Sequence, residues 1–140
     1  VQYFSIYLWF QERDLDGFAS YFLNESQGEM EHAYKFANYL IARGQNVKLK
    51  ELPAPIQSWD SIEDIIAYSF NMEADLTSSL QQLYSISERL SDTRSNVFLD
   101  PIVDAQTKSE DDFAHLLGKV KFAQNQPSAI LLIDSELKKK

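Results

Sequence analysis

Apolar side chains recur along most of the chain at steps of three and four residues, the spacing that places them on one side of an α-helix. This pattern predicts a first helix over residues 1 to about 11 and a second over about 14 to 43, with Gly44 as its left-handed C-terminal cap. Because the pattern is already helical at Val1, we expect the first helix to be truncated.

Residues 45 to 59 contain two prolines and lack helical periodicity, so they are predicted to form a long connection. A third helix is expected to follow, with Asp60 or Ser61 as its N-cap and its end near residue 90.

Asp100 followed by Pro101 fits an N-cap with proline at the first helical position, although a fourth helix starting near Asn96 is equally compatible with the sequence. This helix is predicted to end near residue 123. A short fifth helix is predicted over residues 128 to 137.

The lengths of the connections limit the topology. A helix of roughly 30 residues is about 45 Å long, and an extended chain covers about 3.3 Å per residue. Residues 45 to 59 are therefore long enough to join two parallel helices, whereas the short connections make the other neighbours antiparallel. We expect a single all-α domain over residues 1 to 140, a four-helix bundle with one long crossover and a short C-terminal fifth helix.

The net charge of -8 argues against nucleic acid or an anionic membrane as a partner, because both require a basic surface. It suits a protein that attracts cations. The absence of cysteine excludes thiolate metal sites and cysteine nucleophiles. The apolar runs are too short to span a bilayer and no signal-peptide pattern appears, so we expect a cytoplasmic protein.

Polar side chains interrupt three of the predicted core stripes near the middle of their helices. Glu73 interrupts the stripe of the third helix, and Gln106 and Glu110 interrupt that of the fourth. The stripe of the third helix reads, in order, Ile62, Ile66, Ser69, Glu73, Leu76, Leu80 and Leu83. An unpaired buried charge costs several kcal/mol, so an ordinary core would not contain such residues. The stripe of the second helix reads, in order, Phe18, Phe22, Glu25, Glu29, His32, Phe36 and Tyr39.

Antiparallel packing would bring these polar positions to similar heights in the bundle, where ionised carboxylates are most easily accommodated by shared divalent cations. Oxygen ligands with one imidazole and no sulfur suit iron or manganese, although zinc would also bind. The three-residue spacing of Glu29 and His32 places both side chains on one helical face, where they can bind the same ion.

Each of these residues also has a simpler interpretation. A Glu-x-x-His pair occurs by chance on surface helices, and Glu73 would lie at the surface if the assumed helical phase were wrong by one residue. Gln106 is as compatible with a hydrogen-bonding neighbour of a metal site as with a ligand.

Several of these residues lie in segments that resemble the non-haem ferritins, and the resemblance covers nearly the whole chain. The matching positions, in order, are Tyr3, residues 28 to 33, residues 70 to 73, and residues 98 to 106. Residues 11 to 15 and 96 to 101 look especially like cyanobacterial ferritins.

The resemblance implies a homo-oligomer, a 24-subunit cage that stores iron, in which each subunit oxidises Fe(II) with dioxygen at a non-haem dinuclear centre and deposits Fe(III) mineral in the cavity. This activity is that of a ferroxidase. By the same resemblance Glu29 bridges the two irons, His32 binds the first and Glu73 binds the second. Gln106 lies beside the centre, and Glu110 holds or relays a further ion.

Three more roles follow from the resemblance. Tyr3 matches the tyrosine near the dinuclear centre, which is placed to supply an electron during the reaction with dioxygen. Asp100 resembles the acidic residues that line the threefold channels of the cage, and Glu25 is placed to pass ions from there inward.

The sequence departs from the family pattern in one respect. Ferritins carry a further iron-binding glutamate two turns before the tyrosine, a position that falls upstream of Val1. A second hypothesis is therefore a structural subunit that nucleates mineral with an incomplete, inactive centre. A helical binding module of the cytokine type is a third, which the central carboxylates and the lack of a secretion signal disfavour.

Overall fold

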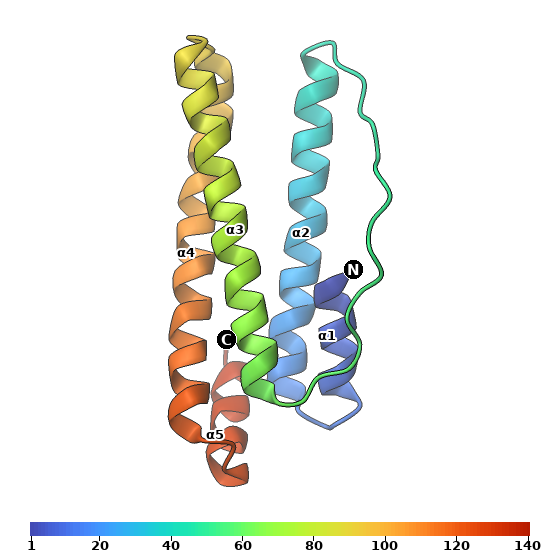
Figure 1. Cartoon of the computed structure of the whole chain (residues 1–140), viewed down its shortest axis with the longest axis vertical. Helices are drawn as coiled ribbons and strands as arrows, with labels where there is room; N and C mark the ends of the chain where they lie inside the picture. Colours follow the sequence, from blue (N-terminus) through green and yellow to red (C-terminus); the bar gives the residue numbers. More distant parts are fainter. The chain divides into compact units, whose positions relative to one another are not determined.

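The computed structural model describes residues 1–140 and is all-α, as predicted (Figure 1). The helices belong to two compact units, the first formed by Val1–Trp59 with Pro127–Lys140 and the second by Asp60–Gln126. None of the helices combines the length and the hydropathy that crossing a membrane requires. The five helices are α1 (Gln2–Gln11), α2 (Asp16–Ala42), α3 (Ile62–Arg89), α4 (Thr93–Ala123) and α5 (Pro127–Lys138).

In the first unit, α1 packs against the beginning of α2 through aromatic rings. We call Tyr3, Phe10, Phe18 and Phe22 the aromatic cluster; all four are fully buried. The rings of Phe10 and Phe18 stack with centroids 4.8 Å apart, and Tyr3 lies 5.7 Å from Phe22. Contacts between these regularly spaced rings therefore hold α1 against α2.

The far end of α2 and the connection after it agree with the sequence pattern. Gly44 has φ +77°, the left-handed conformation predicted for the residue that ends this helix. Residues 45 to 59 then run without helix, as expected from their prolines.

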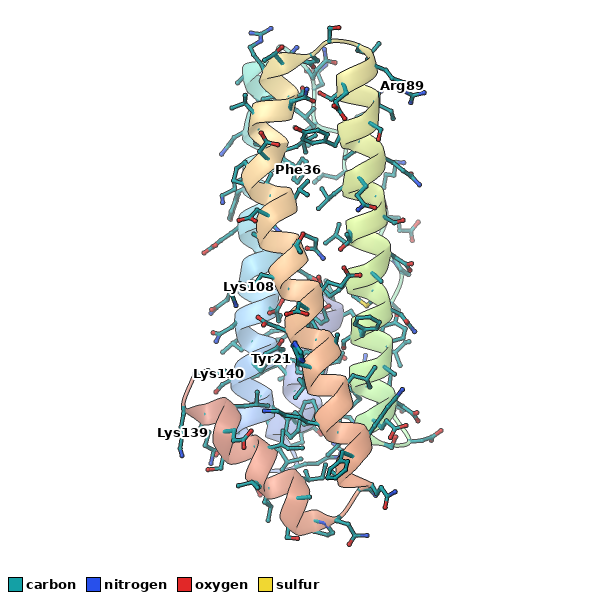
Figure 2. The ribbon with its side chains drawn as sticks, turned by 90° about the vertical axis from the view of Figure 1, so that its left-hand side faces the viewer. Tyr21, Phe36, Arg89, Lys108, Lys139 and Lys140 are labelled. Carbon is teal, nitrogen blue, oxygen red and sulfur yellow. The ribbon has the colours of Figure 1, made fainter.

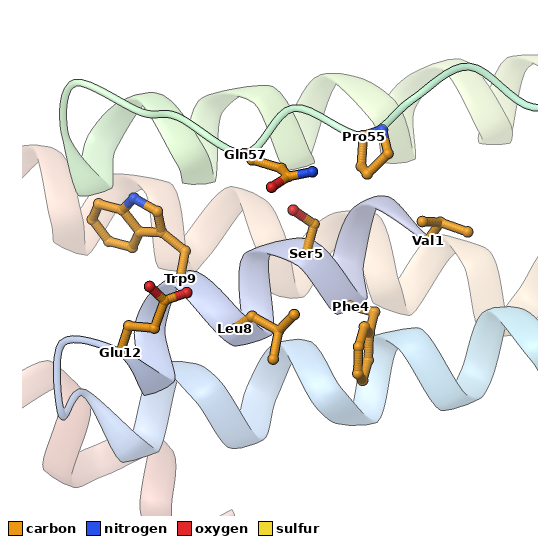
Figure 3. Close-up of a pocket in the computed structure, with 8 residues that line it drawn as sticks. All are labelled: Val1, Phe4, Ser5, Leu8, Trp9, Glu12, Pro55 and Gln57. Atoms are coloured by element: carbon orange, nitrogen blue, oxygen red, sulfur yellow. The ribbon is translucent and has the colours of Figure 1, made fainter.

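Hydrogen bonds fasten this crossover segment to α1. The side-chain amide of Gln2 pairs with the peptide of Ile56: its Nε2 donates to the Ile56 carbonyl at 2.9 Å, and its Oε1 accepts from the Ile56 N–H at 2.8 Å. Ser5 donates to the same carbonyl at 3.1 Å. Between helix and segment lies an open groove of about 250 Å³ (Figure 3), lined by Val1, Phe4, Ser5, Leu8, Trp9, Glu12, Pro55 and Gln57.

In the second unit, α3 and α4 pack side by side as an antiparallel pair (Figure 1). Ser61, one of the two N-caps considered for α3, is the residue that caps it, and its hydroxyl accepts a hydrogen bond from the Asp64 N–H at 3.1 Å. Most of the predicted α3 stripe is buried. Two of its leucines, Leu76 and Leu83, are 40% and 46% exposed.

The prediction that Asp100 caps the fourth helix is wrong, and the alternative start near Asn96 is closer. α4 begins at Thr93, and Asp92 is its N-cap. The carboxylate of Asp92 accepts hydrogen bonds from the main-chain N–H of Ser95 at 3.2 Å and from its hydroxyl at 2.6 Å. This cap satisfies one of the free amides of the first turn, and the helix starts two turns before Asp100.

Pro101 consequently lies inside α4. Its nitrogen cannot donate to the carbonyl of Val97, one turn earlier, so one helical hydrogen bond is lost. The helix continues nevertheless, because Leu99 and Ile102 on either side of the proline are buried and hold this stretch in the core.

We expect Ser61→Ala to lower the free energy of unfolding by about 1 kcal/mol, because the substitution removes the side-chain acceptor at the start of α3. Chemical denaturation at a fixed protein concentration would measure the change. Ser58→Ala, in the exposed crossover segment, is the matched control and should stay within about 0.5 kcal/mol of the parent. Equal effects of the two substitutions would remove Ser61 from its capping role.

Candidate metal centre

Three candidate residues of the first unit lie on one face of α2. Glu25, Glu29 and His32 are separated by steps of four and three residues, and each is half-buried. Glu29 and His32 are therefore neighbours on the helix surface, about 4.5 Å apart along its axis, and can bind the same ion. Fully buried Phe18 and Phe22 precede them on this face. The polar group thus continues an apolar stripe, as the sequence pattern predicted.

Tyr3 reaches the same part of the first unit from α1. Its side chain is fully buried, and its ring lies 5.7 Å from Phe22, one turn before Glu25. Tyr3 is thus held in the core by its ring, close to the polar residues of α2.

In the second unit, Glu73 of α3 and Gln106 of α4 meet in the core. Glu73 is 5% exposed and Gln106 is 2% exposed, so the alternative surface position of Glu73 is excluded. The Gln106 side-chain nitrogen donates to Glu73 Oε2 at 2.6 Å and to the Glu73 main-chain carbonyl at 3.1 Å. These two bonds fix the orientation of the amide, and the contact to the carboxylate is short, as expected for an acceptor that carries charge. Gln106 is thus a hydrogen-bonding partner of Glu73.

Glu110 and Asp100 lie on α4 on either side of Gln106. Glu110 is half-buried one turn further along, whereas Asp100 is exposed. A hydrogen bond with Asp100 raises the pKa of Tyr84, since the bond stabilises the protonated phenol and the nearby negative charge opposes its ionisation. Sequence reasoning did not find this pairing, because it joins residues of two different helices.

The candidate ligands are divided between the two units, with Glu29 and His32 on α2 in the first, and Glu73 and Gln106 on α3 and α4 in the second. Within either unit, no group of three or more histidine and acidic side chains is arranged to hold a metal. The roles predicted for these residues in a shared centre stay predictions.

Other charged residues of α4 face solvent. Lys108 projects from the helix (Figure 2) and forms an ion pair with Asp112 at 3.0 Å. His115 is exposed and lies 3.4 Å from Asp111. Exposed pairs of this kind contribute at most about 1 kcal/mol and do not form a site.

One buried carboxylate was missed by the sequence analysis. Asp134 of α5 is 3% exposed and its Oδ1 accepts a hydrogen bond from the main-chain N–H of Phe18 at 2.9 Å. The available signal was its place beside Ile130, Ile133 and Leu137, which make the apolar face of α5.

A family model described as a ferritin-like domain matches residues 1–123 of the chain. The chain belongs to the ferritin family of iron-storage proteins. Its fold is the ferritin-like four-helix bundle with a short C-terminal helix, which confirms the predicted fold class.

Ferritins from several sources are similar to the chain. The bacterial non-heme ferritin of Bacteroides fragilis is 28% identical over 135 residues, which cover 96% of this chain and 84% of that protein. An open pore ferritin from the archaeon Archaeoglobus fulgidus aligns with a TM-score of 0.92 at 26% identity, covering 97% of this chain and 83% of its own. A variant of PmFTN solved after soaking in iron aligns with a TM-score of 0.88 at 30% identity, covering 95% and 85%. The finer likeness to cyanobacterial ferritins stays a prediction.

Replacement of Gln106 by leucine tests the buried pair. Gln106→Leu replaces the amide by an apolar side chain of similar size and so removes the hydrogen-bond donor to Glu73. Because a buried acceptor loses this hydrogen bond, we expect the free energy of unfolding to fall by about 2 kcal/mol. Chemical denaturation would measure it. Gln82→Leu, at an exposed position of α3, is the control and should change the value by less than about 0.5 kcal/mol. A similar loss in both variants would show that the hydrogen bond contributes nothing specific.

Proposed function

We propose that this ferritin-family chain is an iron-storage subunit that oxidises Fe(II) with dioxygen at a dinuclear centre and deposits Fe(III) mineral in a 24-subunit cage. The observation that carries the proposal is the buried Glu73–Gln106 pair in the middle of a helical core. A carboxylate in that position is costly for stability, and a family that handles iron supplies the reason to retain it.

The ligands proposed for the two irons are oxygen and imidazole groups. Glu29 bridges both irons, His32 binds the first, and Glu73 binds the second. Glutamate and histidine on one helical face, with a further carboxylate from another helix, form a donor set that suits iron. Positive charge on the ions would offset the repulsion between the carboxylates. Two Fe(II) ions, the substrate, would each give up one electron, and the electron pair would reduce one dioxygen to the level of peroxide.

Gln106 is proposed to act through Glu73. Its amide donates hydrogen bonds to Oε2 and to the main-chain carbonyl of Glu73. These bonds restrict the rotation of the Glu73 side chain. A fixed carboxylate loses less conformational freedom when it binds an ion. Glu110, one turn further along α4, is proposed to hold or relay a further ion.

The remaining residues supply electrons and ions. Tyr3 is proposed to donate an electron during the reaction with dioxygen, a role that its full burial supports by excluding water from the phenol. Asp100, exposed on α4, is proposed to line an entry channel, and Glu25 to pass ions inward. The net charge of -8 favours the arrival of cations at such acidic surfaces.

The proposed bridging role of Glu29 predicts a large kinetic effect. Glu29→Ala should slow the initial aerobic oxidation of Fe(II) at least tenfold, because both irons lose a shared ligand. The measurement is the early rise in absorbance of the ferric product. Glu31→Ala removes an exposed carboxylate from the same turn and should leave the rate near that of the parent. An unchanged rate in Glu29→Ala would favour a mineral-nucleating shell subunit without a working centre.

The proposed role of Tyr3 predicts a spectroscopic effect. Tyr3→Phe keeps the buried ring and its contact with Phe22 but removes the oxidisable phenol. Rapid freezing after Fe(II) meets dioxygen should trap a tyrosyl radical signal in the parent protein and in Tyr7→Phe, and no such signal in Tyr3→Phe. A signal of equal size in all three proteins would assign the radical to another tyrosine.

A further inference from the structure

Helix α2 begins without a cap of its own. Its N-cap residue is Leu15, an apolar residue that provides no side-chain hydrogen bond to the first turn. The first amides of a helix have no partner within the helix, so a side-chain oxygen normally accepts from one of them. At α2 that oxygen comes from a different helix.

Asp134 of α5 supplies the missing cap. Its Oδ1 accepts from the Phe18 N–H at 2.9 Å, across 116 positions of sequence, and the residue is 3% exposed. A carboxylate at this end of α2 also faces the positive end of the helix dipole. Its other oxygen lies 3.9 Å from Nζ of Lys138, a half-exposed side chain of α5 itself, at the long limit for an ion pair.

A second, steric feature fits the same docking. A Cβ placed on Gly17 would lie 1.8 Å from the main-chain oxygen of Asp134 and 2.7 Å from its carbonyl carbon. Backbone meets backbone here, so a larger residue at position 17 would have to displace α5. Both a glycine on α2 and a carboxylate on α5 are therefore required at one contact.

The capped turn is also part of the aromatic cluster. The main-chain N–H of Phe18 donates the hydrogen bond to Asp134. The ring of the same residue stacks on Phe10 with an angle of 11° between the two rings. Phe10 stacks on Phe22 at 5.6 Å, and Phe22 contacts Tyr3 at 5.7 Å. A change at the start of α2 therefore reaches Tyr3 through three ring contacts.

We propose that α5 is a latch on the first unit: Asp134 caps α2 from outside, and its docking holds the first turn of α2 and the aromatic cluster in place. Release of α5 uncaps α2 and loosens the packing around Tyr3, so the C-terminal helix controls the order of a site far from it in sequence. The latch is independent of the role proposed for Tyr3 in iron oxidation, because it concerns only the packing around that residue.

Hydrogen exchange of the full chain, read by mass spectrometry, tests the latch. In Asp134→Ala and in Gly17→Ala, we expect the amides of α5 and those of the first turn of α2 to exchange at least tenfold faster than in the parent, and to do so together. Gly118→Ala is the matched control for the glycine, because a Cβ there meets nothing within 4 Å. It should leave exchange in both segments unchanged.

The conservative variant Asp134→Asn distinguishes release of α5 from a general failure of the protein to fold. The amide keeps the shape and an acceptor oxygen but lacks the charge, so both segments should exchange a few-fold faster, with a smaller effect than in Asp134→Ala. The near-ultraviolet circular dichroism of the aromatic cluster should weaken in the same order. Unchanged exchange in Asp134→Asn and Asp134→Ala would overturn the latch, as would loss of protection in α5 while the first turn of α2 stays protected.

Discussion

A carboxylate inside a helical core needs a compensating partner, and this requirement explains the two most specific contacts of the chain. The carboxylate of Glu73 accepts a hydrogen bond from the side-chain amide of Gln106, and that of Asp134 accepts one from the main-chain N–H of Phe18. In each case the donor comes from a different helix of the same unit, so the polar contact specifies which faces pack together. Apolar side chains alone would fix this choice less sharply, since many apolar packings have similar energies.

Features of the fold that depend on local chemistry could be predicted from the sequence. The left-handed Gly44 acts within one turn of its own position, so its residue type was sufficient to predict it. For the same reason the N-cap of α3 could be limited to Asp60 or Ser61, and the structure shows that Ser61 is the cap. The start of α4 could not be chosen in the same way. Asp92 and Asp100 both have a residue type that caps helices. The hydrogen bonds of Asp92 and the burial of Leu99 and Ile102 around Pro101 together favour the earlier start.

Helical periodicity also placed Glu73 and Gln106 in the core, because a stripe of apolar neighbours determines the face on which a residue lies. It gave neither their mutual hydrogen bond nor the role of Asp134, whose partner lies 116 positions away. The same periodicity placed Leu76 and Leu83 in the stripe, yet both are substantially exposed. Periodicity specifies a direction around the helix axis, whereas burial depends on what packs there.

The two buried carboxylates differ in what compensates them, and this difference bears on function. Asp134 lies at the positive end of a helix dipole, so its hydrogen bond comes with favourable electrostatics and a structural role accounts for it. Gln106 gives Glu73 a hydrogen bond but no positive charge, since an amide is neutral. A residue kept only for packing would be replaced by an apolar one at no loss of stability. A cation bound at Glu73 would add a favourable interaction to the hydrogen bond from the neutral amide, and Glu73 is therefore the buried carboxylate that we propose to bind iron.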